Sequence, residues 1–104
     1  MHRGMAPRAQ AKERLTMRFC LQSDISFSET DYGSVILNTR TGRYFQLNAV
    51  ATRMLQLLNE GLSRDEVVDA LIESYDVDRE RASSDLTALI QQGLAADILK
   101  KREP

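Results

Sequence analysis

Alternation of apolar and polar residues predicts strands in the first half of the chain. Ile25 and Phe27 alternate with serines, which is the period of a half-buried strand. Two β-branched or aromatic runs, 34–38 and 43–47, follow at short spacing. Turn-forming residues separate the three segments, and Gly42 can adopt a positive φ at little cost. The pattern therefore predicts a three-stranded antiparallel meander. The residues expected to share its buried face are Val35, Leu37, Phe45 and Leu47.

After the third segment the apolar period changes from 2 to 3.6, which predicts helices. The first helix is expected to begin at the N-cap Asn48 and to end at Gly61, which suits a left-handed C-terminal position. The second helix is expected to begin with a capping box that Ser63 opens. The third is expected to begin at Asp78 and to end at Gly93.

Three strands followed by three helices predict an α+β domain with its helices on one face of the sheet. A hairpin beside two short, tightly joined helices also fits the outline of a winged helix-turn-helix. We expect this domain to span residues 23–99. A basic, mobile N-terminal tail at 1–22 and a short basic C-terminal tail at 100–104 are expected to flank it.

The composition disfavours several classes of chemistry. The only cysteine is Cys20, so no internal disulfide is possible and a reducing compartment fits best. The only histidine is His2, so one thiol and one imidazole supply neither a metal ligand set nor a nucleophile with its base. No apolar run approaches the roughly 20 residues of a membrane helix. We therefore expect a cytoplasmic, non-catalytic protein without cofactor or membrane partner.

Charge is unevenly distributed along the chain. The net charge of -1 combines basic ends with an acidic middle, because residues 21–99 hold thirteen acidic and six basic residues. A helix that reads DNA needs clustered Lys or Arg to meet phosphates. Neither the second nor the third predicted helix is basic, so nucleic acid is not an expected partner. A winged-helix DNA-binding regulator remains the alternative that the fold outline suggests.

An ordered series of short motifs carries a family resemblance. The run YFQLN at 44–48 opens directly into a helix, and GLS at 61–63 follows that helix. YDVD at 75–78 enters the third predicted helix, and QGL at 92–94 leaves it. In this order and spacing, over about residues 25–96, the sequence resembles the PqqD-like family.

The resemblance implies a function. Members of the family are winged helix-turn-helix recognition elements that bind the leader segment of ribosomally made, post-translationally modified peptides and deliver it to a modifying enzyme. This free-standing chain looks most like the members of lasso peptide pathways, which work with a separate leader peptidase. The alternative within the family is the peptide chaperone of pyrroloquinoline quinone synthesis. We expect a monomer or a weak homodimer.

The binding mode that the family implies is addition of the leader as an extra strand to an open sheet edge. We expect the third strand to form that edge, beside the third helix. Phe45 and Leu86 are expected to offer apolar surface, while Arg81 and Asp85 can pair with each other or with charged leader residues. Core packing, a solvated ion pair and pairing of edges between two copies are the competing interpretations. The candidate peptide-binding residues are Arg43, Tyr44, Phe45, Gln46, Leu47, Arg81, Ala82, Asp85, Leu86 and Leu89.

Overall fold

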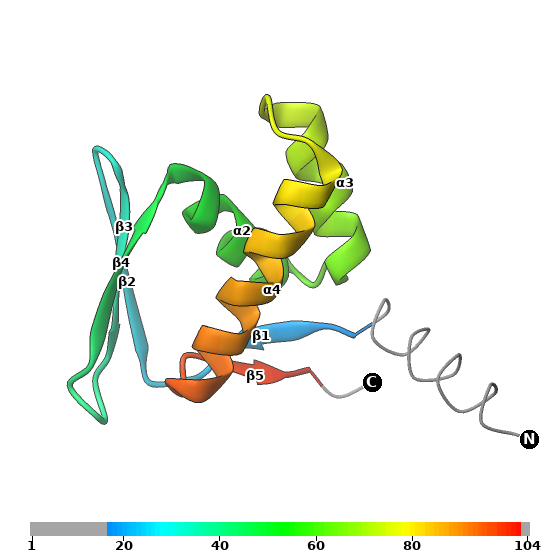
Figure 1. The fold of residues 1–104 in the computed structure, drawn as a ribbon. Coiled ribbons are helices and arrows are strands. Elements are labelled where there is room, and N and C mark those ends of the chain that lie inside the picture. The colour runs from blue at the N-terminus through cyan, green and yellow to red at the C-terminus, as the bar shows by residue number, and fades with distance from the viewer. Residues whose placement is uncertain (1–16, 103–104) are drawn as a thin grey trace, which may run out of the picture.

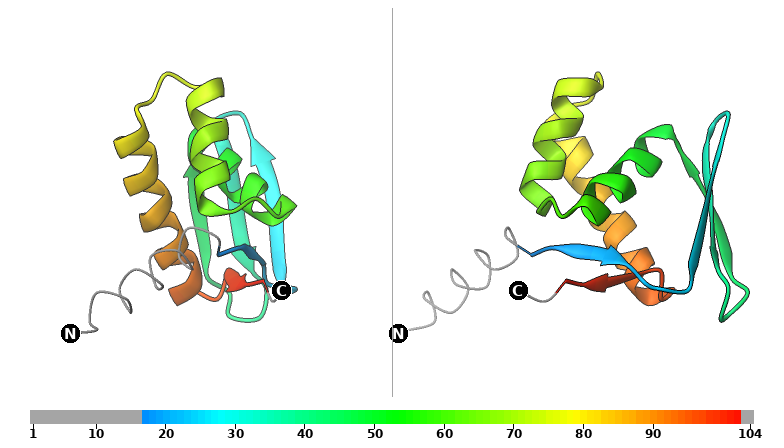
Figure 2. Two further views of the ribbon diagram at one scale, coloured as in Figure 1. Left: turned by 90° about the vertical axis from the view of Figure 1, so that its right-hand side faces the viewer. Right: turned by 180° about the vertical axis from the view of Figure 1, so that it is seen from behind.

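The computed structural model describes residues 17–102 and confirms the predicted α+β fold (Figure 1). The first sixteen residues, which make up most of the expected basic tail, lie outside the described residues. Three helices follow the sheet in sequence, and all three lie on one side of it (Figures 1 and 2). The elements are β1 (Phe19–Leu21), β2 (Ile25–Thr30), β3 (Gly33–Asn38), β4 (Tyr44–Asn48), α2 (Ala49–Glu60), α3 (Arg64–Ser74), α4 (Arg79–Ala95) and β5 (Leu99–Lys101).

The larger sheet has the order β2-β3-β4, so that β2 and β4 are its edges. Ile36, in the central strand, lies opposite Phe27 on β2 and Phe45 on β4, and these three side chains face the helices. The hairpin between β3 and β4 turns at Gly42, whose φ of 80° is the left-handed conformation that its sequence predicted.

One prediction about the buried face is wrong. Val35 and Leu37 lie opposite Gln46 and Tyr44, on the face of the sheet that points away from the helices. The buried positions of β3 are instead the intervening ones, Ser34, Ile36 and Asn38. The run 34–38 shows no clean alternation of polarity, so its period does not reveal which face is buried. Phe45 and Leu47 do face the helices, as expected.

Hydrogen bonds allow two polar residues to occupy that buried face. The Ser34 and Thr52 hydroxyls lie 2.7 Å apart and join β3 to α2. The Asn38 side chain donates to the carbonyl of Asp97 at 2.9 Å and accepts from the backbone N–H groups of Arg40 and Thr41. Burial of these polar groups is therefore compensated, and Asn38 ties the β3–β4 loop to the turn after α4.

The predicted helix starts are confirmed. Asn48 accepts a hydrogen bond from the backbone of Ala51 at the start of α2, and Ser63 opens a complete capping box at the start of α3. Asp78 caps α4. The predicted end of α4 is wrong, because the helix continues two residues past Gly93 to Ala95. This glycine has a packing role instead: a Cβ there would lie only 2.8 Å from a methyl carbon of Leu99.

The domain is larger than the predicted span 23–99. β1 and β5 form a separate two-stranded antiparallel sheet, in which Phe19 lies opposite Lys101. Phe19 is only 2% exposed and belongs to the core formed by the three helices. The expected tail boundaries at 22 and 100 are therefore wrong. Strands of three residues carry too little periodicity to be found in a sequence, and this pair forms only when distant segments meet.

No helix within residues 17–102 is long and apolar enough to cross a bilayer.

Candidate functional site

The free edge of β4 offers unpaired backbone groups. The N–H of Asn38 donates to the carbonyl of Arg43 at 2.9 Å where the hairpin closes. Because opposed pairs in an antiparallel ladder alternate between bonded and non-bonded, Phe45 and Leu47 bond to β3. The N–H and C=O groups of Tyr44 and Gln46 therefore point outward, where an added strand can pair with them.

An apolar groove lies beside this edge. α4 runs along the sheet on the side of β4 (Figure 2, left), and a small groove of about 30 Å³, partly open to solvent, lies between them. Phe45 and Leu47 provide one wall, and Leu89 provides part of the other. The remaining lining residues are Ile36, Leu55, Gln92, Gly93, Ile98 and Leu99. A peptide strand on β4 would thus have a side-chain pocket next to its backbone partners.

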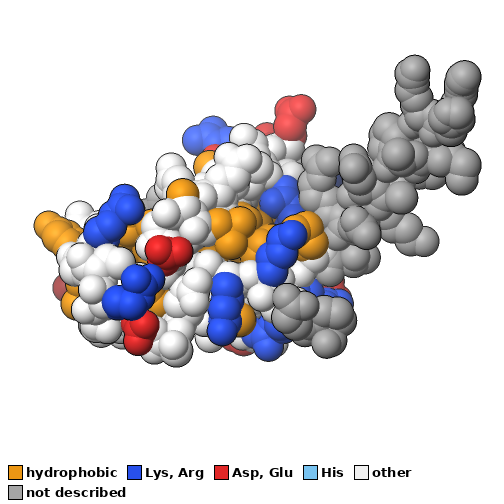
Figure 3. Space-filling model, turned by 90° about the horizontal axis from the view of Figure 1, so that it is seen from below, with side chains coloured by type: hydrophobic (Ala, Val, Ile, Leu, Met, Phe, Trp, Pro, Cys, Tyr) orange, Lys and Arg blue, Asp and Glu red, His pale blue; other side chains and the backbone are white. Residues whose placement is uncertain are grey.

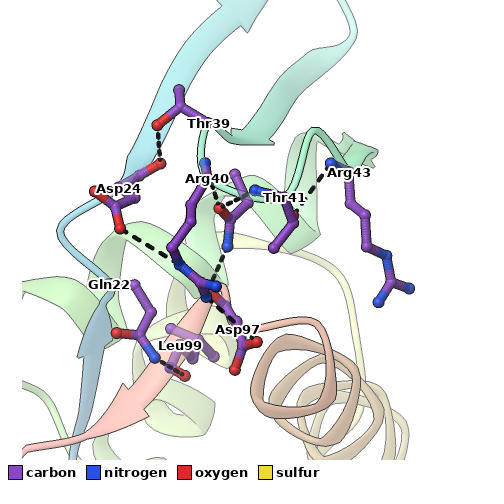
Figure 4. Close-up of polar contacts among 9 residues, drawn as sticks. Gln22, Asp24, Thr39, Arg40, Thr41, Arg43, Asp97 and Leu99 are labelled. Atoms are coloured by element: carbon purple, nitrogen blue, oxygen red, sulfur yellow. Dashed lines mark hydrogen bonds and ion pairs between the residues drawn. The ribbon is translucent and has the colours of Figure 1, made fainter.

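Charged side chains lie on the elements that form this groove and on the neighbouring loop. On α4, Arg81 and Asp85 pair with each other at 3.5 Å and are well exposed. At the start of β4, the guanidinium of Arg43 lies 5.6 Å from the centre of the Phe45 ring. Arg40 bridges Asp24 and Asp97 at 3.6 and 3.5 Å, which fastens the β3–β4 loop beside the end of α4 (Figure 4).

The structure places the predicted site residues in several different positions. Phe45, Leu47 and Leu89 line the groove as expected. Arg43 lies beside the ring of Phe45, and Tyr44 and Gln46 place their side chains on the outer face of the sheet. Arg81 and Asp85 form the exposed pair on α4.

Ala82 and Leu86 occupy a different place from the one expected. They are 2% and 0% exposed and belong to the helical core. Leu86 therefore cannot offer open apolar surface to a peptide, because α4 turns this residue toward α2 and α3. Its neighbour one turn later, Leu89, faces the groove instead.

Several groove residues were missed by the sequence analysis. Gln92 and Gly93 come from the last turns of α4, and Ile98 and Leu99 come from the segment that leads into β5. The position of Leu99 depends on the pairing of β5 with β1, in which it lies opposite Leu21. The sequence signal that could have found the missed residues is Gly93, which was interpreted as a helix end although a glycine inside a helical pattern can mark close packing.

The described residues contain no group of three or more His, Cys, Asp or Glu side chains arranged to hold a metal ion. Cys20 lies half-buried in β1, opposite Lys100 and away from the groove. His2 lies outside the described residues.

The sequence and the fold are similar to those of known proteins. The family model for PqqD, coenzyme PQQ synthesis protein D, matches residues 33–99. A lasso peptide synthetase B1, solved in complex with the leader peptide, is 36% identical and superposes with a TM-score of 0.72; the match covers 80% of this chain and 98% of that one. TbiB1, solved in complex with the TbiA(β) leader peptide, is 30% identical with a TM-score of 0.71, covering 82% and 99%. No curated protein sequence matches the chain.

Proposed function

The chain belongs to the PqqD family, and from this membership we propose that it is a non-catalytic recognition element for a ribosomally made precursor peptide. It binds the leader segment of the precursor as an added strand on β4. It then presents the peptide to a modifying enzyme or leader peptidase. The lasso peptide type is favoured over a role in pyrroloquinoline quinone synthesis, because the solved relatives include a lasso peptide synthetase B1 bound to its leader peptide.

One observation carries this proposal: an open strand edge and an apolar groove lie side by side. The outward N–H and C=O groups of Tyr44 and Gln46 supply affinity that is independent of sequence. The groove, with Phe45 and Leu89 on opposite walls, supplies the choice of side chain. An edge that is left open without a Pro or a bulge is otherwise a liability for a small protein.

A direct binding titration tests the proposal. The protein is titrated into a fluorescent peptide that corresponds to the leader of the short precursor gene nearest to its own gene, with a scrambled peptide as the control. Saturable binding at about micromolar Kd or tighter, absent for the scrambled peptide, is the expected result. If the folded protein binds neither peptide, with or without the neighbouring modifying enzyme, the leader-recognition function is wrong.

Substitutions in the groove locate the binding surface. Phe45→Ala and Leu89→Ala are each expected to weaken leader binding about 5- to 30-fold, because each removes apolar surface that the peptide would bury. Leu94→Ala is the matched control, since Leu94 is an exposed leucine on α4 that does not line the groove. Circular dichroism checks that each variant is folded. Folded groove variants that bind as tightly as the Leu94 variant would place the peptide elsewhere.

A further inference from the structure

Arg43 lies on the groove side of the edge strand. Side chains alternate along a strand, so Arg43 shares a face with Phe45 and Leu47, both of which line the groove. The distance of 5.6 Å between its guanidinium and the ring centre of Phe45 agrees with this placement. The backbone there is held by the Asn38 hydrogen bond to the Arg43 carbonyl. The cation is therefore positioned at the rim of the groove before any ligand arrives.

The positive charge of Arg43 is not neutralised within residues 17–102. Asp24 and Asp97 both pair with Arg40 in the β3–β4 loop. Figure 4 shows the Arg43 side chain directed away from this cluster. No ion pair with Arg43 is found in the described part of the chain, whereas Arg81 on α4 is paired with Asp85.

Other basic side chains lie on the lower face of the molecule. Seen from below, several Lys and Arg side chains lie on this face, with acidic side chains between some of them (Figure 3). Lys100 and Lys101 on β5 are exposed. An anionic group near the start of β4 would be attracted by the guanidinium of Arg43, although the described chain as a whole is acidic.

We propose that Arg43 determines peptide specificity by binding a carboxylate of the leader strand, an inference that rests on the proposed function. The guanidinium offers paired N–H donors in a fork that matches a carboxylate. Arg43 and Phe45 are two residues apart on one face of β4. The Asp or Glu that binds Arg43 is therefore two positions along the leader from the residue that lies against Phe45.

The test combines variants of the protein with variants of the peptide. Arg43→Gln is expected to weaken binding of the nearest-precursor leader about 5- to 30-fold, and Arg43→Lys is expected to weaken it less. Arg53→Gln is the control for net charge, because Arg53 pairs with Glu60 on α2 and does not line the groove. Replacing each Asp or Glu of the leader by its amide should identify one carboxylate whose loss weakens binding to the wild-type protein but not to the Arg43→Gln variant.

A reversal of charge provides a second readout. Arg43→Glu should bind the unmodified leader poorly and recover affinity for a leader in which the identified Asp or Glu is replaced by Lys. The inference is overturned if Arg43→Gln and Arg53→Gln bind the leader equally well, or if every leader carboxylate is dispensable. If the wild-type protein still binds the leader, either result contradicts only the role of Arg43 and not the proposed leader-recognition function. A wild-type protein that binds no leader overturns both.

Discussion

Single residues at the helix ends behave as their local sequence predicts. At the start of α3, the Glu66 carboxylate accepts from the Ser63 backbone N–H at 2.8 Å, and the Ser63 hydroxyl accepts from the Glu66 N–H at 3.3 Å. The first of these bonds lowers the pKa of Glu66, and Arg18, 3.1 Å from the carboxylate, lowers it further. The contact between Arg18 and Glu66 thus joins the capping box to the segment before β1. Local sequence patterns do not predict it, because the two residues are far apart in the chain.

Glu66→Ala should therefore destabilise the protein in a pH-dependent way. A carboxyl whose pKa is lower in the folded than in the unfolded state contributes its full stabilisation above the unfolded value, near 4.5, and loses it as pH falls through the folded value. The difference in free energy of unfolding between wild type and variant should be present at neutral pH and should narrow in acid. Urea unfolding at pH 7 and pH 3 measures it. An equal difference at both values would contradict this account.

At the scale of elements, the two edges of the larger sheet are not equivalent. β4 has α4 beside it, with the groove between them, while β2 occupies the opposite edge. Along β4 the backbone groups alternate: those of Phe45 bond to β3, and those of Gln46 face outward. Leader binding by strand addition needs only the outward groups. Substitution can therefore separate leader binding from the pairing of β4 with β3.

Proline substitutions at two neighbouring positions of β4 test leader binding and sheet pairing separately. Gln46→Pro removes an outward N–H, which an edge strand tolerates, so the variant should stay folded and bind leader at least roughly tenfold more weakly. Phe45→Pro removes an N–H that pairs with β3 and should unfold or strongly destabilise the sheet. Circular dichroism and the fluorescence titration measure the two effects. A folded Gln46→Pro variant with undiminished affinity would rule out strand addition at this edge.

At the scale of the whole molecule, the two ends of the described chain are fastened together. β1 and β5 pair, Gln22 donates its backbone N–H to Ile98, and Arg102 donates to Arg18. The same segment carries Ile98 and Leu99 into the floor of the groove. The β1–β5 sheet therefore stabilises the core and completes the groove at once.

Phe19→Ala tests this coupling. Burial of Phe19 within the core predicts a loss of about 3–5 kcal/mol of stability, which is a large share of what a small domain possesses. Lys100→Ala, on the exposed side of β5, is the control and should change stability by less than about 0.5 kcal/mol. Thermal and chemical unfolding measure both. A Phe19→Ala variant as stable as the Lys100→Ala variant would show that β1 is not part of the folded unit.

The sequence predicted one wall of the candidate groove better than the other. Phe45 and Leu47 lie on a strand, where a period of two leaves only one choice once the face is known. On α4 the apolar positions Leu86 and Leu89 lie a turn apart, and one faces the core while the other faces the groove. Helical periodicity identifies such a stripe but does not divide it between two neighbours.

By itself, the sequence determined the local features of this protein: the number and order of the main elements, the left-handed turn at Gly42 and the caps at Asn48, Ser63 and Asp78. These depend on interactions between residues a few positions apart, which any short segment displays. Tertiary structure alone decided which face of β3 is buried, that β1 and β5 pair, and that Arg43 is left without an acidic partner in the described chain. Those outcomes depend on contacts between segments far apart in sequence, so they are set only when the whole domain packs.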